Sequence, residues 1–289
     1  MLTSVKLVNG SRELVLLPRQ DDGIYLQSLD APMPEVRAVT EARTDDDGER
    51  DTTQLFGARA CSIELLVTEA ARTFEDDIAR YLHPRVRPYL VVEDTGWSQA
   101  RRLGLRSDQF SAPLGVDLPL RDGRRVQVQW RCPDGVWEAD ALSSATVNAD
   151  VDATTGLSLP FSLPVALAAT QASGAATVSN VGAVPAHFTA RLYGPCTDPS
   201  LRNETTGEEI TFAGGLVLAA GDYIEIDTRD RTAYLTVNGS SSRVDRLGFL
   251  DWAASSWWQL EPGINQIRYA PSATSAGAAA VIEWRSQWL

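Results

Sequence analysis

Alternation of apolar and polar residues is the clearest pattern in the first half of the chain. In residues 125–132 the apolar side chains from Val126 to Cys132 occupy every second position, and residues 61–67 alternate in the same way. Because a strand turns successive side chains to opposite faces, both segments are predicted to be strands with one buried face. Shorter β-like runs are 2–9, 13–17, 24–28, 89–93 and 101–106.

One segment of this half has the spacing of a helix instead. Between residues 73 and 82, Phe74, Ile78, Tyr81 and Leu82 recur at helical intervals, after a threonine that can cap the first turn. His83-Pro84 ends the pattern, since a residue before proline is disfavoured in helical geometry. The polar residues 30–52 suit a long exposed hairpin tip or loop.

The second half of the chain consists of many short alternating runs separated by turn residues. Gly221 to Gly239 reads as a hairpin, and Pro262-Gly263 breaks the chain between two further apolar runs. This spacing is typical of a β-sandwich or jelly roll. The runs are 161–168, 175–181, 186–193, 209–212, 216–219, 223–228, 231–237, 264–270 and 279–287.

The composition changes to Ala, Ser, Thr, Asn and Asp over residues 141–159, which indicates a domain boundary. We therefore predict a mostly β protein of two domains. Residues 1–142 form a β-sandwich or split-barrel-like domain with one helix at about 73–82. Residues 143–160 form a linker, and residues 161–289 form a second β-sandwich.

Charge and composition exclude several function classes. The net charge of −12 is shared equally between the two sides of residue 145, with 18 Lys+Arg against 24 Asp+Glu and then 8 against 14. No basic domain is hidden, so recognition of nucleic-acid bases is not expected. No apolar run approaches the roughly 20 residues of a membrane span, and no signal segment stands at the start. We expect a protein made in a cytoplasm, with no membrane partner.

Candidate catalytic chemistry is sparse. Cys61, Cys132 and Cys196 are odd in number and widely spaced, which favours buried structural thiols over disulfides or a zinc site. His83 and His187 have no nucleophile elbow or carboxylate at a useful spacing, and no phosphate-binding glycine loop is present. We expect no enzyme activity, no metal and no cofactor.

One alternative class stays open on the carboxylates. Glu225 and Asp227 alternate on one predicted strand, and a glycosidase would need two carboxyl groups about 5–10 Å apart in a cleft. Such pairs are common on exposed strands. The enzyme reading therefore depends on whether two carboxylates converge.

Charged segments suggest contacts between subunits. The acidic run contains Asp45, Asp46, Asp47 and Glu49; it could attract calcium, but it lacks the regular ligand spacing of a calcium loop. Arginines concentrate later in the same half. An interface that places one subunit's acidic loop on the next subunit's arginines would use both. The candidate arginines are Arg85, Arg87, Arg101 and Arg102.

Tryptophans cluster just before the Pro262-Gly263 turn. Trp252, Trp257 and Trp258 could stack on a sugar, as in carbohydrate-binding sandwiches, or seal the end of a core. The second interpretation is the more common one. Exposure of these rings would separate the two.

Four segments of the second half occur in a recognisable order. They are Ser-Asn-Val-Gly-Ala-Val-Pro-Ala at 179–186, Asn-Glu-Thr-Thr-Gly at 203–207, Gly-Asp-Tyr-Ile-Glu-Ile-Asp-Thr at 221–228 and Leu-Glu-Pro-Gly-Ile-Asn at 260–265. This order resembles the C-terminal domain of the distal tail proteins of long-tailed, non-contractile bacteriophages. The first half, with its polar 40–52 segment, strand, helix and later strands, resembles the tail-tube-like, ring-forming domain of that family.

The resemblance implies a structural virion protein, not an enzyme. Six copies would form a ring at the distal end of the tail through the N-terminal domain, and galectin-like C-terminal sandwiches would radiate outward and carry adsorption machinery. The partners implied are the protein itself, the tail tube protein, a tail hub or tail-associated protein and other minor tail proteins. The alternative is a carbohydrate-binding, receptor-binding module of a tail tip or another minor tail protein.

Overall fold

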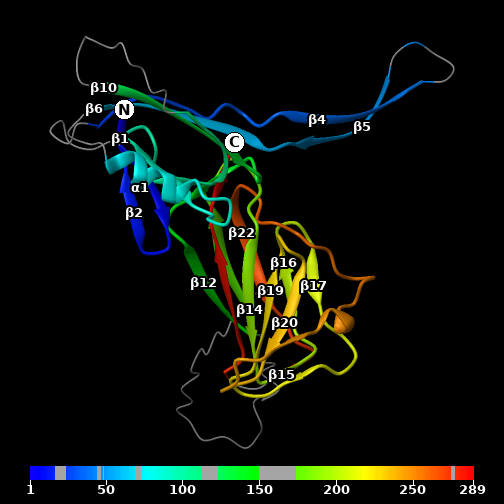
Figure 1. The fold of residues 1–289 in the computed structure, drawn as a ribbon. Coiled ribbons are helices and arrows are strands. Elements are labelled where there is room, and N and C mark those ends of the chain that lie inside the picture. The colour runs from blue at the N-terminus through cyan, green and yellow to red at the C-terminus, as the bar shows by residue number, and fades with distance from the viewer. Residues whose placement is uncertain are drawn as a thin grey trace, which may run out of the picture. The chain divides into compact units, whose positions relative to one another are not determined.

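The chain folds into two compact units. The computed structural model describes residues 1–16, 24–43, 47, 49–68, 73–111, 123–149, 174–274 and 277–289. The N-terminal unit comprises Met1–Ala141 with Trp288–Leu289, and the C-terminal unit comprises Leu142–Gln287 (Figure 1). Among the described residues, no helix has the length and apolar character needed to cross a membrane.

Two sheets form the body of the N-terminal unit. The six-stranded sheet has the order β2-β1-β7-β8-β11-β25, and the four-stranded sheet has the order β3-β6-β10-β9. The first contains β1 (Leu2–Asn9), β2 (Arg12–Val15), β7 (Tyr89–Asp94), β8 (Arg101–Gly104), β11 (Trp137–Ala139) and β25 (Gln287–Trp288). The second contains β3 (Ile24–Asp30), β6 (Arg59–Thr68), β9 (Arg106–Ser111) and β10 (Gly123–Cys132).

The core of this unit follows the periodicities of the sequence. Strands β6 and β10 pair antiparallel along their whole length, and the alternating apolar side chains of both are buried. Helix α1 (Thr73–Tyr81) buries Phe74, Ile78 and Tyr81 in the same apolar cluster. The predicted strands and the helix are confirmed, because each segment has a single apolar face that this core removes from water.

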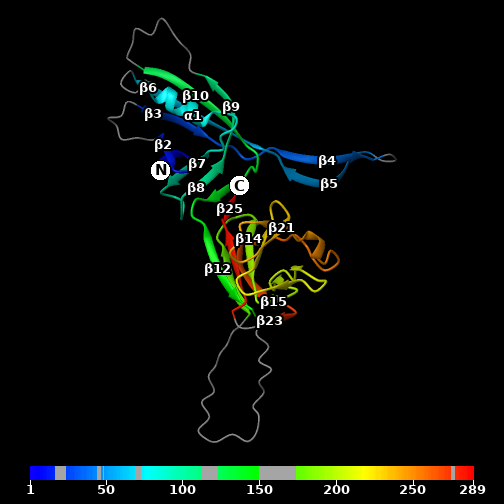
Figure 2. The same ribbon diagram turned by 60° about the horizontal axis from the view of Figure 1, so that its bottom comes forward.

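A separate two-stranded ladder accounts for the polar segment between residues 30 and 56. Strands β4 (Val36–Ala42) and β5 (Glu49–Phe56) pair only with each other, with one register shift between Val39 and Thr40. In both views the hairpin extends away from helix α1 (Figure 1, Figure 2). Of the two forms expected for residues 30–52, a hairpin tip or a loop, the structure has a hairpin, and its strands run from Val36 to Phe56.

The C-terminal unit is built from strands packed around a second core. Its sheets have the orders β12-β24-β14-β19-β20-β21, β13-β22-β16-β17 and β18-β15-β23. The strands of the first are β12 (Ser143–Asn148), β14 (Phe188–Tyr193), β19 (Tyr223–Asp227), β20 (Thr232–Thr236), β21 (Arg243–Asp245) and β24 (Ala279–Trp284). The others are β13 (Ala175–Asn180), β15 (Cys196–Thr197), β16 (Ser200–Asn203), β17 (Glu209–Thr211), β18 (Val217–Leu218), β22 (Gly263–Tyr269) and β23 (Ala273–Thr274), and a 3₁₀ turn, η2, spans Leu247–Phe249.

The fold class is confirmed: the chain is mostly β, its sheets form sandwiches, and α1 is the one α-helix in the described ranges. The structure differs from the expected linker at its start. Residues 143–148 form β12, which pairs with β24 from Ser143↔Trp284 to Asn148↔Ala279. The predicted strand at 161–168 lies outside the described residues.

Candidate assembly surface

The recurring asparagines of the C-terminal unit hold its turns together. Asn180, Asn203 and Asn265 are all fully buried. The Asn265 Nδ2 donates to the Glu261 carbonyl at 2.8 Å, and its Oδ1 accepts from the Glu261 N–H at 3.1 Å. The same Oδ1 accepts from the Asn203 Nδ2 at 3.1 Å. Buried amides used in this way satisfy turn backbone groups that a strand ladder cannot reach.

The first motif closes in a similar manner. The Asn180 Nδ2 donates to the carbonyls of Val184 and Leu260, both at 2.9 Å, and its Oδ1 accepts from the Gly182 N–H at 2.9 Å. A Cβ on Gly182 would overlap the backbone of Gln287, so only glycine fits this close approach. Residues 179–186 therefore have a structural role: they hold this turn against Leu260 and Gln287.

The acidic motif on β19 also serves the backbone. The Asp222 Oδ1 accepts from the Asn238 N–H at 2.9 Å, which joins the two ends of the β19–β20 hairpin. The Asp227 Oδ1 accepts from the N–H groups of Arg229 and Asp230 at 2.8 and 3.0 Å. Each carboxylate caps a turn, so this motif shapes the sandwich.

The glycosidase alternative gains no support from this geometry. Glu225 forms ion pairs with Arg191 at 3.0 Å and with Arg243 at 2.7 Å, while Asp227 caps the turn after β19. In the part of the chain that the structure describes, no group of three His, Cys, Asp or Glu side chains gathers as metal ligands do. Both carboxylates already have structural partners.

The three tryptophans occupy different environments. Trp258 is 2% exposed and packs on Phe188, with ring centroids 4.4 Å apart, so it has no face for a sugar. Trp257 is half-buried against the same core, and Trp252 is 63% exposed. The sugar-stacking set is therefore corrected: Trp258 belongs to the core, because its ring fills the space between the sheets.

Free thiols are found where the sequence predicted them. Cys61, Cys132 and Cys196 are all buried and none forms a disulfide. Burial raises the pKa of the Cys196 thiol, whose Sγ lies 3.2 Å from the Tyr269 hydroxyl. The interpretation as structural thiols is confirmed.

Two of the candidate interface arginines have intramolecular partners. The Arg101 guanidinium lies 4.3 Å from the ring centroid of Trp97 and 4.2 Å from that of Trp288. Arg102 stacks on Tyr89 and forms an ion pair with Glu138 at 3.1 Å. Stacking and ion pairing hold both side chains within the sheet, and their place in an interface between subunits stays a prediction.

The other interface candidates are charged residues at two places in the N-terminal unit. Arg85 and Arg87 are exposed after α1. Asp47 is exposed between the two strands of the β4–β5 hairpin, and Glu49 begins β5. Asp45 and Asp46 lie outside the described residues. An interface between this acidic run and the two exposed arginines stays a prediction.

A groove of about 820 Å³ lies at the base of the β4–β5 hairpin, where β4 begins and β5 ends. We call this base the hairpin neck. The groove is bounded by the start of β4, the end of β5, the start of β6, β9 and the end of β10. The charged side chains in its wall are Glu35, Arg37, Arg59, Arg106, Asp108 and Arg131. No pattern in the sequence indicates this groove, because its wall comes from segments that only the sheet brings together.

Arg59 holds the neck of the hairpin in place. Its Nε donates to the Gly135 carbonyl at 2.9 Å, and its Nη1 donates to the Ala31 carbonyl at 3.1 Å. Gly135 has φ +68°, and a Cβ there would lie 2.8 Å from the Gly57 carbonyl. The side chain is 2% exposed, and this burial lowers the pKa of its guanidinium. The buried guanidinium of Arg59 thus connects the hairpin neck to the backbone at Ala31 and at Gly135.

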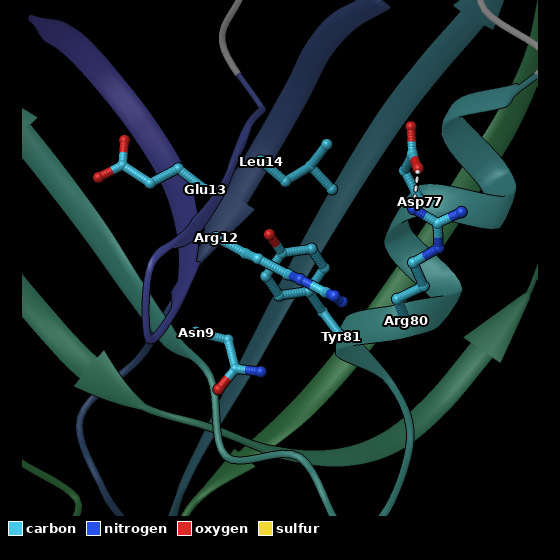
Figure 3. A pocket seen from close by; sticks show the side chains of 7 residues that line it. All are labelled: Asn9, Arg12, Glu13, Leu14, Asp77, Arg80 and Tyr81. Atoms are coloured by element: carbon cyan, nitrogen blue, oxygen red, sulfur yellow. Dashed lines mark ion pairs between the residues drawn. The ribbon is translucent and has the colours of Figure 1, made fainter.

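A second, smaller pocket of about 280 Å³ lies between β1, β2 and α1 (Figure 3). Asp77 and Arg80 form an ion pair at 3.0 Å on its helical wall, and Glu13 pairs with Lys6 at 3.3 Å. Burial raises the pKa of Tyr81, which also lines this pocket. Its two carboxylates are already paired, so it offers no distinct ligand chemistry.

Residues 181–288 match the model of a known family, the siphovirus-type tail component, C-terminal domain. The second half of the chain is therefore similar to this tail component domain. The match covers most of the four motifs whose asparagines, glycines and aspartates close the sandwich. This match confirms the resemblance of residues 181–288 to the tail proteins of siphoviruses that the four motifs predict.

Solved structures extend the likeness to the whole chain. The fold matches the crystal structure of SPP1 Dit (gp 19.1), described as a paradigm of the hub adsorption apparatus in phages that infect Gram-positive hosts. That match has TM-score 0.62 and 13% identity, and it covers 99% of this chain and 100% of the other. No match was found among curated protein sequences.

Chains of the phage P2 baseplate in its activated conformation are also similar. The Ca structure matches with TM-score 0.53 and 11% identity, covering 99% of this chain and 98% of the other. The Sr structure matches with TM-score 0.51 and 10% identity, covering 98% and 97%. At these identities the likeness establishes the fold alone. The tail component domain identifies the protein as a structural component of a phage tail.

Proposed function

We propose that this protein is the distal tail hub of a siphophage, a homohexameric ring that joins the tail tube to the tip. The observation that carries the proposal is the whole-chain likeness to SPP1 Dit, a hub protein, together with the tail component domain at residues 181–288. In this proposal, residues 1–142 form the ring at the distal end of the tail in the virion. The C-terminal sandwich carries the adsorption machinery, and the protein is made in the host cytoplasm.

The N-terminal unit has the features that ring assembly needs. Strands β3 and β9 are the edges of the four-stranded sheet, and an edge strand leaves backbone donors and acceptors available for a neighbour. Hairpin β4–β5 exposes apolar side chains at its base: Val36 is 50%, Leu55 53% and Phe56 45% exposed. A neighbouring subunit that covered this hairpin would remove the apolar surface from water.

Partners follow from the same role. The tail tube protein would contact one face of the ring, and a tail-associated hub protein would contact the other. Receptor-binding or other minor tail proteins would attach through the C-terminal sandwich. A structural role needs no catalytic group, consistent with a family of tail components.

Gold-labelled antibodies against this protein, imaged on virions of the phage that encodes it, test the proposed location. Label confined to the end of the tail away from the capsid is expected. Label along the whole tube, or at the capsid, would refute the hub assignment. Antibody against the tail tube protein provides the control for access along the tail.

A second candidate is carbohydrate binding by the C-terminal unit, which one observation favours. Trp252 is 63% exposed and stands on a surface loop, where an indole face can stack on a sugar ring. Glycan-array binding that is lost in Trp252→Ala would support this function. Binding that persists in the variant, or no binding to any glycan, would exclude Trp252 as a sugar platform.

A further inference from the structure

Two arginines face each other across neighbouring strands at the hairpin neck. In the β9–β10 ladder Arg106 is paired directly with Arg131, just past the register shift between Gln129 and Trp130. Paired residues point to the same face of a sheet, and like charges in this position repel each other. Both line the groove of about 820 Å³. An isolated subunit thus keeps an unfavourable arrangement that a bound anion would relieve.

The wall of this groove is positively charged in an acidic protein. Four arginines and two carboxylates line it, and the chain as a whole carries a net charge of −12. Within the described ranges, none of Arg37, Arg106 and Arg131 forms an ion pair, and Arg106 Nη1 bonds only to the Leu105 carbonyl, at 2.8 Å. The groove therefore has cationic donors to offer.

Two buried donors in the same wall lack acceptors. The Arg59 Nη2 and the Trp130 Nε1 have no hydrogen-bond partner among the described residues, although the two side chains are only 2% and 1% exposed. Unsatisfied buried donors are rare in native proteins and call for an acceptor. Arg59 and Trp130 can only donate, and Trp130 lies on the core face of β10, opposite to Arg131, so the donors that a bound anion would meet are those of Arg37, Arg106 and Arg131.

We propose that this groove binds the acidic connection between β4 and β5 of a second copy of the chain. Together with the first two residues of β5, that connection forms the segment Arg43-Thr-Asp-Asp-Asp-Gly-Glu-Arg50. Its four carboxylates match the arginines of the groove. The flanking Arg43 and Arg50 match the groove's own Glu35 and Asp108. The inference rests on the proposed ring, and it moves the arginine side of the interface from Arg85 and Arg87 to the hairpin neck.

The geometry of the hairpin makes this contact intermolecular. The ladder runs from Val36↔Phe56 at the neck to Ala42↔Glu49 next to the acidic connection, so groove and connection lie at opposite ends of one hairpin. Eight strand residues span about 26 Å. A domain of about 140 residues has a radius of gyration of only about 14 Å, so the connection can reach an adjacent subunit. Each subunit would donate one contact and receive one, as in a closed ring.

Charge reversal with rescue tests the contact in the full-length protein. Arg106→Glu with Arg131→Glu reverses the groove, and Asp45→Lys, Asp46→Lys and Asp47→Lys reverse the connection. We expect each set alone to raise the concentration for half-assembly by roughly a hundredfold or more, because like charges then meet at the interface. The two sets combined restore assembly. Arg85→Glu with Arg87→Glu is the matched control and leaves assembly unchanged.

The outcomes separate this inference from the proposed ring. If the wild type forms rings and the groove variant forms them at the same concentration, the groove is not the contact but the hub proposal stands. Loss of assembly only in the Arg85 and Arg87 variant would overturn the inference equally. If the wild type forms no ring even with tail tube protein, the ring proposal fails.

In that last case a labelled peptide of residues 43–50 still tests the groove by fluorescence anisotropy. Binding to the wild type that is lost in Arg106→Glu with Arg131→Glu supports the site. Absence of binding, or equal binding to both proteins, overturns it.

Discussion

Individual polar residues of the C-terminal unit are bound to backbone groups or to arginine side chains, which gives the residues of its motifs a structural role. Asp222 and Asp227 cap turns, and Glu225 is held between Arg191 and Arg243. A carboxylate or amide used in this way fixes one loop conformation. Substitutions of these residues are therefore expected to lower the free energy of unfolding.

Replacement of Asn265 tests this role. Asn265→Ala leaves the Glu261 N–H, the Glu261 carbonyl and the buried Asn203 Nδ2 without their partner at the fully buried position 265. We expect the free energy of unfolding to fall by about 3 kcal/mol, since unsatisfied buried groups cost about 1–3 kcal/mol each. Chemical denaturation measures the change. Asn148→Ala, at an exposed position on β12, is the matched control, and an equal effect of both would contradict the assigned role.

The tryptophans give a second comparison at this scale. Trp258→Ala is expected to lower the free energy of unfolding by about 3–5 kcal/mol, because it empties a space between the sheets that Phe188 also lines. Trp252→Ala removes a ring that is 63% exposed and should change stability by less than about 0.5 kcal/mol. Thermal or urea unfolding of the two variants distinguishes them, and similar losses would contradict the burial assigned here.

At the scale of elements, sequence periodicity was sufficient wherever a segment has one buried face. The strands at 61–67 and 125–132 and the helix near 73–82 were predictable for this reason. Residues 143–148 were expected to be linker because Ser-Ser-Ala-Thr-Val-Asn carries little apolar pattern. Its strand state comes from pairing with β24, far away in sequence.

The candidate site was less predictable, since its residues meet through register. The concentration of arginines predicts Arg101 as an interface residue, whereas its stacking partner Trp288 lies at the opposite end of the chain and meets it only through the fold. Arg106 and Arg131 come together only through the register shift in the β9–β10 ladder. No local pattern in the sequence specifies such a shift. The acidic half of the proposed contact, in contrast, was visible as a charge run.

The contact between the start of β1 and the end of β7 predicts how the stability of the fold depends on pH. Asp94 accepts from the Gly96 N–H at 2.7 Å and pairs with the terminal ammonium of Met1 at 3.0 Å, and these two contacts lower the pKa of its carboxyl group. A lowered pKa in the folded state stabilises the fold above the ordinary pKa of aspartate. This contribution is lost as the pH falls through the folded value.

Asp94→Asn should therefore be less stable than the wild type at about pH 7, and the difference should shrink as the pH falls below about 4. Urea denaturation of both proteins across this range measures it. A difference that stays constant with pH would show that the carboxylate charge is not the stabilising feature.

At the scale of the whole molecule, the two units have different proposed roles, assembly of the ring and attachment of other tail proteins. The N-terminal unit offers open sheet edges, a projecting hairpin and a cationic groove at its neck, all of which suit contacts between copies. The C-terminal unit is a tail component domain closed by buried amides, which suits a rigid support for other tail proteins. The central claim is that the first unit assembles six copies into a ring.

The solution mass of the purified protein, measured by light scattering and followed by negative-stain imaging, tests that claim most directly. One chain has a mass of 31.4 kDa, so the account predicts a particle of about 188 kDa for six copies, seen as rings with an open centre. The measurement is repeated with tail tube protein present. A monomer at every accessible concentration in both conditions would contradict the account.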